Sequence, residues 1–347
     1  MKVLLLLNGP EGWQTGIEDG FSYLQSIGEI SDLHWLYLHH YCSQMGVDNG
    51  LEHALSLAGD FSPDIIVVFH VGSLPVSSDF IFNIKNIRSN PVLIYDEGDM
   101  YGSWAKPITK SMKTVIRLAD VVSIRGLGKF YNEILLLNKN VIYTPHHADI
   151  ARFDNEPYIL ENRKNKIVLI GNKSKPKYLS WMRRLPGARS REVFVKRMGK
   201  EFPEDFLLYG AGWGNFIGHQ GRVDFQKQLD IYRQSWVTVA YEHYPEIPFY
   251  FSNRLPLALL AGSLYVCHYH NGYEEIFKGC DFIFFFRTNS EAIDLIKYIH
   301  SMSKEELLAR SRRARKFALQ HYHPNVVWRN FLNNSISLLN NADRKDF

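Results

Sequence analysis

The strongest constraint on the fold is an alternation of short apolar runs with segments of helical period, which occurs twice along the chain. In the first half, five apolar runs fit strands buried on both faces: 2–7, 33–38, 64–71, 91–96 and 121–124. Segments of helical period separate them, at about 15–27, 50–58, 79–88, 107–119 and 127–137. Strands that alternate with helices predict a parallel, doubly wound sheet.

The alternation stops at residues 145–165, a polar stretch with two prolines, and then begins again with KIVLIG at 166–171. We therefore predict an α/β fold with two Rossmann-like domains, each a doubly wound parallel sheet. The domains span residues 1–148 and 166–324, and a linker at 149–165 joins them. A last helix at 325–342 is expected to cross back to the N-terminal domain. The length of 347 residues suits two domains.

Charge is distributed unevenly between the two halves. Residues 1–148 contain 10 Lys and Arg against 15 Asp and Glu, a net charge of −5, whereas residues 149–347 contain 30 against 21, a net charge of +9. A basic half suits an anionic ligand such as a nucleotide, although solubility explains it equally well. The basic run RSRRARKF (310–317) spreads its charges over more than one helix face. We therefore interpret it as a solvated helix rather than a nucleic-acid site.

The sequence disfavours a membrane-spanning protein, a secreted protein and a protein held together by disulfides or a zinc cluster. The chain has no apolar run of the roughly 18–20 residues that a membrane helix needs. Its start resembles a buried strand more than a secretory signal. Three widely spaced cysteines indicate neither a disulfide framework nor a zinc cluster. We expect a cytoplasmic protein, and leave open a peripheral association with the inner face of the membrane.

Candidate site residues follow the predicted strands of the first half, because parallel sheets bind ligands at the carboxyl ends of their strands. The loop after the first strand contains Gly9 and Gly12, without the dinucleotide-binding glycine spacing. His70 ends the third strand, and Asp96 and Asp99 follow the fourth; any of these three side chains could act as a general base. A tight turn, a buried histidine and a solvated acidic turn are the alternative interpretations. The chain has no Asp-x-Asp motif, so no metal site is expected.

In the second half, the strand at 166–171 runs into a loop with three lysines in five residues, beginning at Lys173. Ammonium groups there would suit a diphosphate, although a solvated loop is the alternative. The next strand ends at Gly210 and Gly212, which would admit a ligand close to the backbone. Trp213 follows and could stack on a nucleotide base, although a packed indole is the commoner outcome.

The segments NRLPLALLAG…YHNGYEEIF and DFIFFFRTNSEAIDLIKYI resemble the C-terminal half of the CgeB-like glycosyltransferases, which are related to group 1 glycosyl transferases. The resemblance covers roughly 235–325, and the segment VIYTPHHADIARF (141–153) is similar to the end of the first domain in this family. It implies the GT-B architecture, in which two Rossmann-like domains face a cleft. It also implies a nucleotide-activated sugar as donor.

The resemblance assigns roles to individual residues. Arg254 matches the family arginine expected near the donor diphosphate. Asn271 and Gly272 match a turn that places backbone N–H groups by the phosphates. Glu274 or Glu275 matches the acidic residue that follows this turn.

One position departs from the family pattern. The family has a glutamate three residues after the arginine, which is expected to bind the nucleotide ribose, but this chain has Leu257. Ribose recognition would then fall to another carboxylate, such as Glu242, Glu246 or Glu275.

The sequence therefore predicts a metal-independent glycosyltransferase that needs no cofactor beyond its nucleotide-diphosphate sugar. The acceptor would be a glycan, a lipid-linked molecule or a protein, and no nucleic-acid partner is expected. Three alternatives remain: a catalytically silent relative that binds a sugar nucleotide or glycan, another two-domain enzyme such as a sugar-nucleotide epimerase or a phosphorylase, and a nucleic-acid-binding protein.

Overall fold

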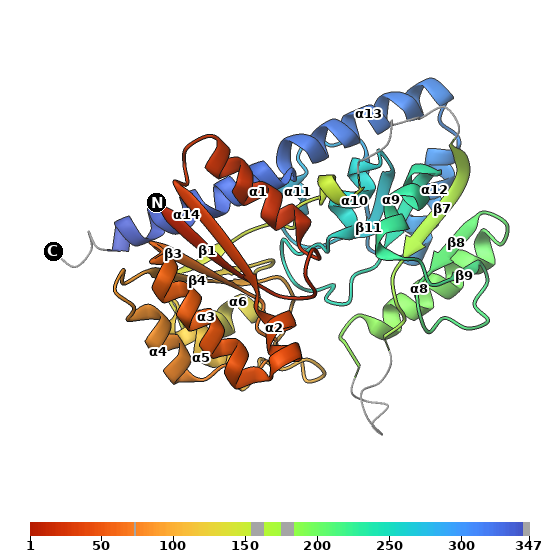
Figure 1. Ribbon diagram of the computed structural model, residues 1–347. Coiled ribbons are helices and arrows are strands. Elements are labelled where there is room, and N and C mark those ends of the chain that lie inside the picture. The colour runs from red at the N-terminus through yellow and green to blue at the C-terminus, as the bar shows by residue number, and fades with distance from the viewer. Residues whose placement is uncertain (73, 154–162, 175–183, 343–347) are drawn as a thin grey trace. The chain divides into compact units, whose positions relative to one another are not determined.

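The computed structural model describes residues 1–72, 74–153, 163–174 and 184–342 (Figure 1). The contacts divide the chain into two compact units. Unit 1 comprises residues 1–102, 107–145 and 324–347, and unit 2 comprises residues 103–106 and 146–323. Each unit contains one six-stranded parallel sheet, which confirms the predicted fold class. Residues 154–162 of the predicted linker lie outside the described residues.

Unit 1 is a sheet with strand order β2-β1-β3-β4-β5-β6. Alternate β1 side chains pack with α1 and α14 on one face, and α3, α4 and α5 form a neighbouring row of helices. The elements in chain order are β1 (Lys2–Leu7), α1 (Thr15–Ser26), β2 (Asp32–Tyr37), α2 (Leu38–Met45), α3 (Val47–Phe61), β3 (Ile65–Phe69), α4 (Ser78–Lys85), β4 (Val92–Glu97), α5 (Lys110–Leu118), β5 (Val121–Ile124), α6 (Lys129–Leu135), β6 (Val141–Tyr143) and α14 (Pro324–Ala342).

The last helix belongs to unit 1, where α14 lies along α1 (Figure 1). Its anchor is Trp328, whose side chain is fully buried. The indole packs against Phe21 of α1 and Phe69 of β3, with ring centroids 5.6 and 5.5 Å away. Its Nε1–H donates to the carbonyl of Gly16 at 3.2 Å. This aromatic cluster ties the end of the chain to the first helix and the centre of the sheet.

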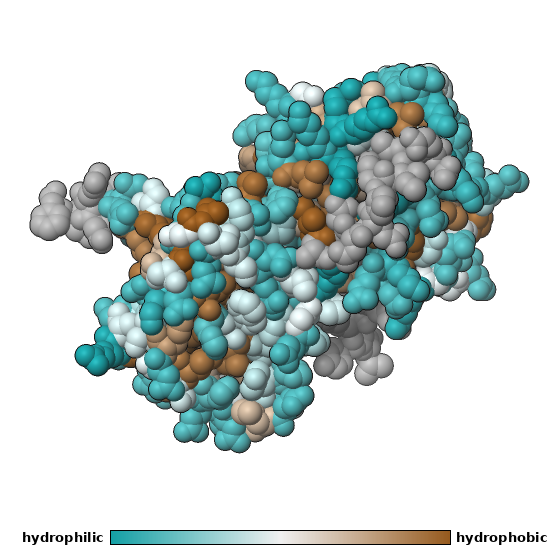
Figure 2. Space-filling model, turned by 45° about the horizontal axis from the view of Figure 1, so that its top comes forward, coloured by the Kyte–Doolittle hydropathy of each residue, from teal (hydrophilic) through white to brown (hydrophobic). Residues whose placement is uncertain are grey.

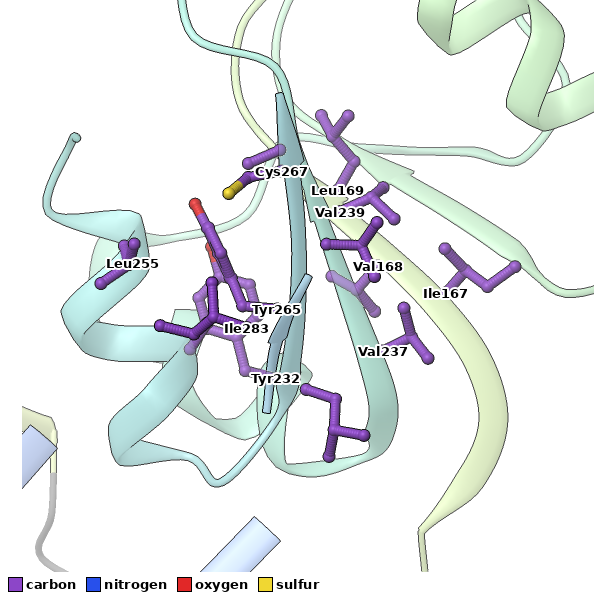
Figure 3. Packing of buried hydrophobic residues seen from close by; sticks show 14 of the residues in the cluster. Ile167, Val168, Leu169, Tyr232, Val237, Val239, Leu255, Tyr265, Cys267 and Ile283 are labelled. Atoms are coloured by element: carbon purple, nitrogen blue, oxygen red, sulfur yellow. The ribbon is translucent and has the colours of Figure 1, made fainter. Parts of the chain in front are cut away.

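Unit 2 has the strand order β12-β11-β10-β7-β8-β9. Figure 3 shows aliphatic side chains of β7 and β10 packed together, with Tyr265 of β11 facing Leu255 of α10. The elements are α7 (Ile150–Phe153), β7 (Lys164–Ile170), α8 (Ala188–Glu201), β8 (Phe206–Tyr209), β9 (His219–Gly221), the 3-10 turn η1 (Phe225–Lys227), α9 (Gln228–Arg233), β10 (Ser235–Ala240), α10 (Arg254–Leu260), β11 (Leu264–His268), α11 (Tyr273–Ile276), β12 (Ile283–Phe286), α12 (Asn289–His300) and α13 (Lys304–His321).

Side-chain caps begin α12 and α13. The Thr288 hydroxyl accepts a hydrogen bond from the N–H of Glu291, and Ser303 does the same for Glu306. Several short elements were not predicted, among them α2 and β9. α2 follows β2 without a break, so the apolar run of the strand hides its start. β9 is His219–Gly221, a polar tripeptide whose strand geometry comes from pairing with β8 rather than from its own pattern.

We predict that Gly20→Ala lowers the stability of the protein by about 1–3 kcal/mol, as overpacking of a tight interface does. A Cβ on Gly20 would lie 2.3 Å from Cδ1 of Trp328 and 3.0 Å from the carbonyl oxygen of Pro324. Thermal and urea unfolding of the two proteins measure the difference.

The matched control is Gly59→Ala in α3, where a Cβ would meet nothing within 4 Å. Because alanine favours a helix by about 0.5–1 kcal/mol over glycine, this variant should be at least as stable as the parent protein. Equal stability of Gly20→Ala and the parent would contradict the tight packing of α1 on α14.

Candidate functional site

In each sheet there is one point, here called the switch point, at which successive connections leave in opposite directions. In unit 2 the chain leaves β7 toward β8 on one side and later returns to β10 on the other side. In unit 1 it leaves β1 toward β2, and β3 lies on the opposite side of β1. Loops that leave such neighbouring strands diverge, and ligands of parallel sheets bind between them.

Unit 2 has a pocket of about 440 Å³ at its switch point. The residues that line it come from the carboxyl ends of β7 and β8, from the segment 222–228 and from the start of α10. They are Ile170, Gly171, Asn172, Gly210, Ala211, Arg222, Val223, Phe225, Gln228, Asn253 and Arg254.

Two glycines let the pocket wall pack closely. A Cβ on Gly171 would lie 1.9 Å from Nη2 of Arg191, and one on Gly210 would lie 2.3 Å from the carbonyl oxygen of Gly171. Gly210 and Gly212 also have positive φ, at +136° and +87°. The Trp213 indole is 2% exposed and donates its Nε1–H to the Gly171 carbonyl at 2.7 Å. Trp213 therefore supports the loop from inside, and its burial corrects the expectation that it stacks on a base.

Arg254 begins α10 and forms an ion pair with Glu242, which follows β10. Its Nη2 donates to Oε2 of Glu242 at 2.6 Å, and its Nε donates to the Ser252 hydroxyl at 3.0 Å. Ser252 in turn donates to Oε1 of Glu242 at 2.8 Å. The Glu242 side chain is 5% exposed and that of Arg254 is 19% exposed. This closed triangle fixes the guanidinium at the pocket wall.

A second arginine, Arg191 of α8, lies beside this triangle and was not predicted. Its side chain is buried, and its Nη1 donates to Nε2 of His243 at 2.9 Å. In the sequence, Arg191 shares helical spacing with Phe194, Val195 and Met198, so its position on the buried face was readable. Its charge next to the pocket was not, because only the fold brings α8 to Gly171.

The pKa values reflect this crowding. Burial alone would raise the pKa of Glu242, but Arg254, Arg191 and the Ser252 hydrogen bond together lower it to about 2. Burial and the neighbouring charge of Arg254 lower the pKa of Arg191 to about 9. The pKa of Arg254 is raised, because Glu242 outweighs the effect of burial. Burial and the two arginines lower the pKa of His243 to about 3, so this imidazole is neutral at pH 7. The Glu242 carboxylate is therefore stabilised by the charges of two arginines, Arg254 and Arg191.

The predicted lysine loop is described only in part. Lys173 forms an ion pair with Glu192 of α8 at 3.1 Å, and its ammonium lies 4.7 Å from the ring centroid of Phe216. Its backbone N–H donates to the carbonyl of Ala211 at 2.9 Å. The remaining lysines of the run fall in 175–183, outside the described residues.

The predicted turn at Asn271 and Gly272 is present and caps α11. Gly272 has φ +90°, and a Cβ there would lie 2.4 Å from Cζ of Phe249. Phe249 donates its backbone N–H to the carbonyl of Asn271 at 2.8 Å, so its ring is held on the turn. Glu274 accepts a hydrogen bond from the Tyr269 hydroxyl at 2.7 Å, and Glu275 is exposed.

In unit 1 the ends of β3 and β4 bring a histidine and a carboxylate together. Nδ1 of His70 lies 2.5 Å from Oε1 of Glu97, and the Tyr95 hydroxyl donates to Oε2 of Glu97 at 2.5 Å. The Glu97 side chain is fully buried, whereas that of His70 is 24% exposed. His70 has φ +40°, an uncommon value for a residue other than glycine. The buried carboxylate orients the imidazole through Nδ1, and a proton on Nδ1 would leave the lone pair on Nε2.

The two aspartates predicted as bases have other positions. Asp96 is 2% exposed and forms a bidentate ion pair with Arg125, with N–O distances of 2.6 and 2.8 Å. Its Oδ1 also accepts from Ser123 at 2.6 Å, so Asp96 joins β4 to β5 rather than serving as an accessible base. Asp99 is exposed, and its backbone N–H donates to Glu97 at 3.0 Å. Glu97, which lies between them and was not selected as a candidate, is the carboxylate that contacts His70.

Two further findings concern the described residues. They contain no group of three or more His, Cys, Asp and Glu side chains that could hold a metal ion. None of the helices within the described ranges is long and apolar enough to span a bilayer. Figure 2 shows hydrophilic residues over most of the face in view, interrupted by small groups of hydrophobic ones.

We predict that Glu242→Gln destabilises the protein at pH 7 by about 3 kcal/mol, because it removes the carboxylate that pairs with Arg254 and offsets the charge of the buried Arg191. The folded-state pKa of about 2 lies below the usual value of 4.5, so the stabilisation is present above pH 4.5. It is lost as the pH falls toward 2. Thermal unfolding of both proteins between pH 7 and pH 3 should therefore show a difference that shrinks on acidification.

Glu246→Gln is the control for this experiment, because Glu246 is an exposed carboxylate in the same loop. It should change the unfolding temperature little at any pH. A constant difference between Glu242→Gln and the parent over the whole pH range would contradict the role of the ionised carboxylate.

Comparison with known proteins now adds a family and a fold. Residues 183–333 match the family model described as Glycosyl transferase-like. No curated protein matches the sequence. A solved glycosyltransferase from Rickettsia africae is similar over 97% of this chain and 98% of its own, with a TM-score of 0.62 and 14% identity.

Two other solved structures share the fold. AviGT4, a glycosyltransferase involved in avilamycin A biosynthesis, is similar over 98% of both chains, with a TM-score of 0.61 and 12% identity. HepE of Anabaena, solved with UDP and glucose, is similar over 97% of this chain and 100% of its own, with a TM-score of 0.59 and 11% identity. Residues 183–333 thus resemble glycosyl transferases, and the chain as a whole has the fold of these solved structures, the two Rossmann-like domains of the GT-B type.

Proposed function

We propose that the protein transfers a sugar from a nucleotide-diphosphate donor, held by unit 2, to a hydroxyl of an acceptor that is activated by unit 1. The acceptor would be a glycan, a lipid-linked molecule or a protein, and no resident metal or cofactor would take part. The observation that carries the donor assignment is the Arg254–Glu242 ion pair at the pocket wall with a second, buried guanidinium, Arg191, beside it. This surplus of positive charge at a pocket of about 440 Å³ favours an anion such as a diphosphate.

The solved structures with a similar fold support this class of donor. HepE of Anabaena was solved with UDP and glucose, and an E. coli trehalose-6-phosphate protein with UDP-2-fluoro glucose. At 11% and 10% identity these structures support the kind of ligand and leave its sugar and base open.

The chemistry can be written with the residues of the chain. The bond between the anomeric carbon and the diphosphate oxygen breaks, and the acceptor oxygen forms the new bond to that carbon. Arg254, with Arg191 behind it, stabilises the charge that develops on the departing diphosphate. Nε2 of His70 takes the proton of the acceptor hydroxyl, and Glu97 holds the ring in the orientation required for this transfer.

A second candidate function, a silent protein that binds the nucleotide sugar without transfer, is favoured by one observation. Leu257 is 2% exposed in the core, so α10 offers no carboxylate to a ribose. Release of free nucleotide during incubation with a sugar nucleotide distinguishes an enzyme from a silent binder.

We predict that Arg254→Ala weakens the binding of a nucleoside diphosphate by about 1.5–3 kcal/mol, the contribution of a charged hydrogen bond. A thermal-shift screen of the parent with UDP, GDP, dTDP and CMP identifies the nucleotide, and titration of both proteins gives the difference. Arg312→Ala, an exposed arginine of α13, is the control and should bind like the parent. Failure of all four nucleotides to stabilise the parent would overturn the donor assignment.

We predict that His70→Asn lowers the transfer rate by at least about 100-fold, as loss of a general base does, while nucleotide binding stays unchanged. Asparagine tolerates the positive φ of this position, so the variant removes the base without adding strain. Product formation is measured by chromatography at saturating donor. His53→Asn, on the exposed side of α3, should keep full activity. Full activity of His70→Asn would exclude the role given to this imidazole.

A further inference from the structure

A large aromatic side chain is exposed at the carboxyl ends of the unit 1 strands. Trp13, in the loop that follows β1, is 46% exposed. An indole offers a flat apolar face with a negative electrostatic potential, and leaving it in water forgoes the gain from burial. Such side chains are enriched where a surface binds a partner or ligand.

The loop holds the indole in a defined position. The ring packs on Gly9, where a Cβ would lie 3.0 Å from Cδ1 of Trp13. The backbone N–H of Trp13 donates to the carbonyl of Pro10 at 3.1 Å. The next residue, Gln14, donates its backbone N–H to the Tyr37 hydroxyl at 3.1 Å and its side-chain amide to Oδ1 of Asn8 at 2.8 Å. The exposed ring is therefore preorganised, which lowers the entropy cost of binding a ligand.

The topology places this loop at the switch point of the sheet. β1 and β3 are paired in parallel up to Leu6 opposite Val68, so the loops that leave them start at the same edge. From there the chain passes through α1 to β2 on one side and through α4 to β4 on the other. Trp13 and His70 thus lie on the two loops that diverge at this switch point, the position where parallel sheets commonly bind ligands.

The charge near the ring selects the kind of ligand. The loop at 8–14 contains Glu11 and no lysine or arginine, and residues 1–148 have a net charge of −5. An anionic ligand would be repelled there. The amides of Asn8 and Gln14 offer both donors and acceptors, which suit hydroxyl groups.

We propose that Trp13 is the stacking platform for a neutral saccharide ring of the acceptor, and that this loop excludes acidic sugars. The apolar C–H face of a pyranose packs on the indole, while its hydroxyls hydrogen-bond to the polar groups of the loop. The inference rests on the proposed function for the identity of this ligand as an acceptor.

Saturation-transfer difference NMR tests the proposal with a panel of neutral methyl pyranosides, cellobiose and maltose, and with a methyl glucuronide as the acidic counterpart. We expect signals from ring protons of at least one neutral sugar and weaker binding of the glucuronide. Trp13→Ala should raise the dissociation constant by roughly tenfold, corresponding to the loss of one stacked ring, and Trp13→Phe by less.

Trp35→Ala is the matched control, because Trp35 is a 38% exposed tryptophan within β2, away from the strand ends. It should bind the sugars like the parent. Equal binding by Trp13→Ala and the parent, an equal loss in Trp35→Ala, or no signal from any neutral sugar would overturn the proposal. Thermal shifts with nucleotides are recorded on the same proteins. If the parent protein binds the neutral sugars but none of the nucleotides, the proposed transfer is wrong, whereas the role of Trp13 in sugar binding is retained.

Discussion

Parallel strand pairing is the constraint on which the rest of this structure depends. Each parallel pair needs a crossover, so all strands of a sheet end at the same edge, and the loops diverge wherever the strand order reverses. In unit 2 this occurs between β7 and β10, which brings Gly171 and Glu242 to one edge. In unit 1 it occurs between β1 and β3, where the loops carry Trp13 and His70. The residues of the proposed donor and acceptor sites thus lie at the points where the loops of each sheet diverge.

Buried charge has a different meaning in the two units. In unit 1, Asp96 and Arg125 neutralise each other through two short hydrogen bonds, and Ser123 completes the pair. The Asp96–Arg125 pair leaves no net charge for a ligand to neutralise, and it joins β4 to β5. In unit 2, Arg254 pairs with the carboxylate of Glu242, and burial together with the neighbouring charge of Arg254 lowers the pKa of Arg191 to about 9. An anion would relieve that excess of charge, which is why the donor is assigned there.

Much of the fold was predictable, because apolar runs and helical periods report burial directly. Strands β1 to β5, β7 and β8 followed from such patterns. Arg254 and the Gly272 turn were recognised because their neighbours resemble a known family. The contact of Glu97 with His70 was not predicted, because adjacent residues of a strand point to opposite faces and the run does not say which face meets His70. Arg191 was missed because its helix approaches Gly171 only in the folded unit.

The order of residues in this chain is sufficient to specify two doubly wound sheets and the strand ends at which polar side chains gather, since both depend on local periodicity. Which of those side chains meet depends on register and helix packing, which are decided by contacts between residues far apart in the sequence. The partners of Glu242, the dyad of His70 with Glu97 and the burial of Trp213 beneath Gly171 are all of this second kind. Tertiary structure alone decides them, because the energies of a buried ion pair or a packed indole arise only once water has been excluded between the elements.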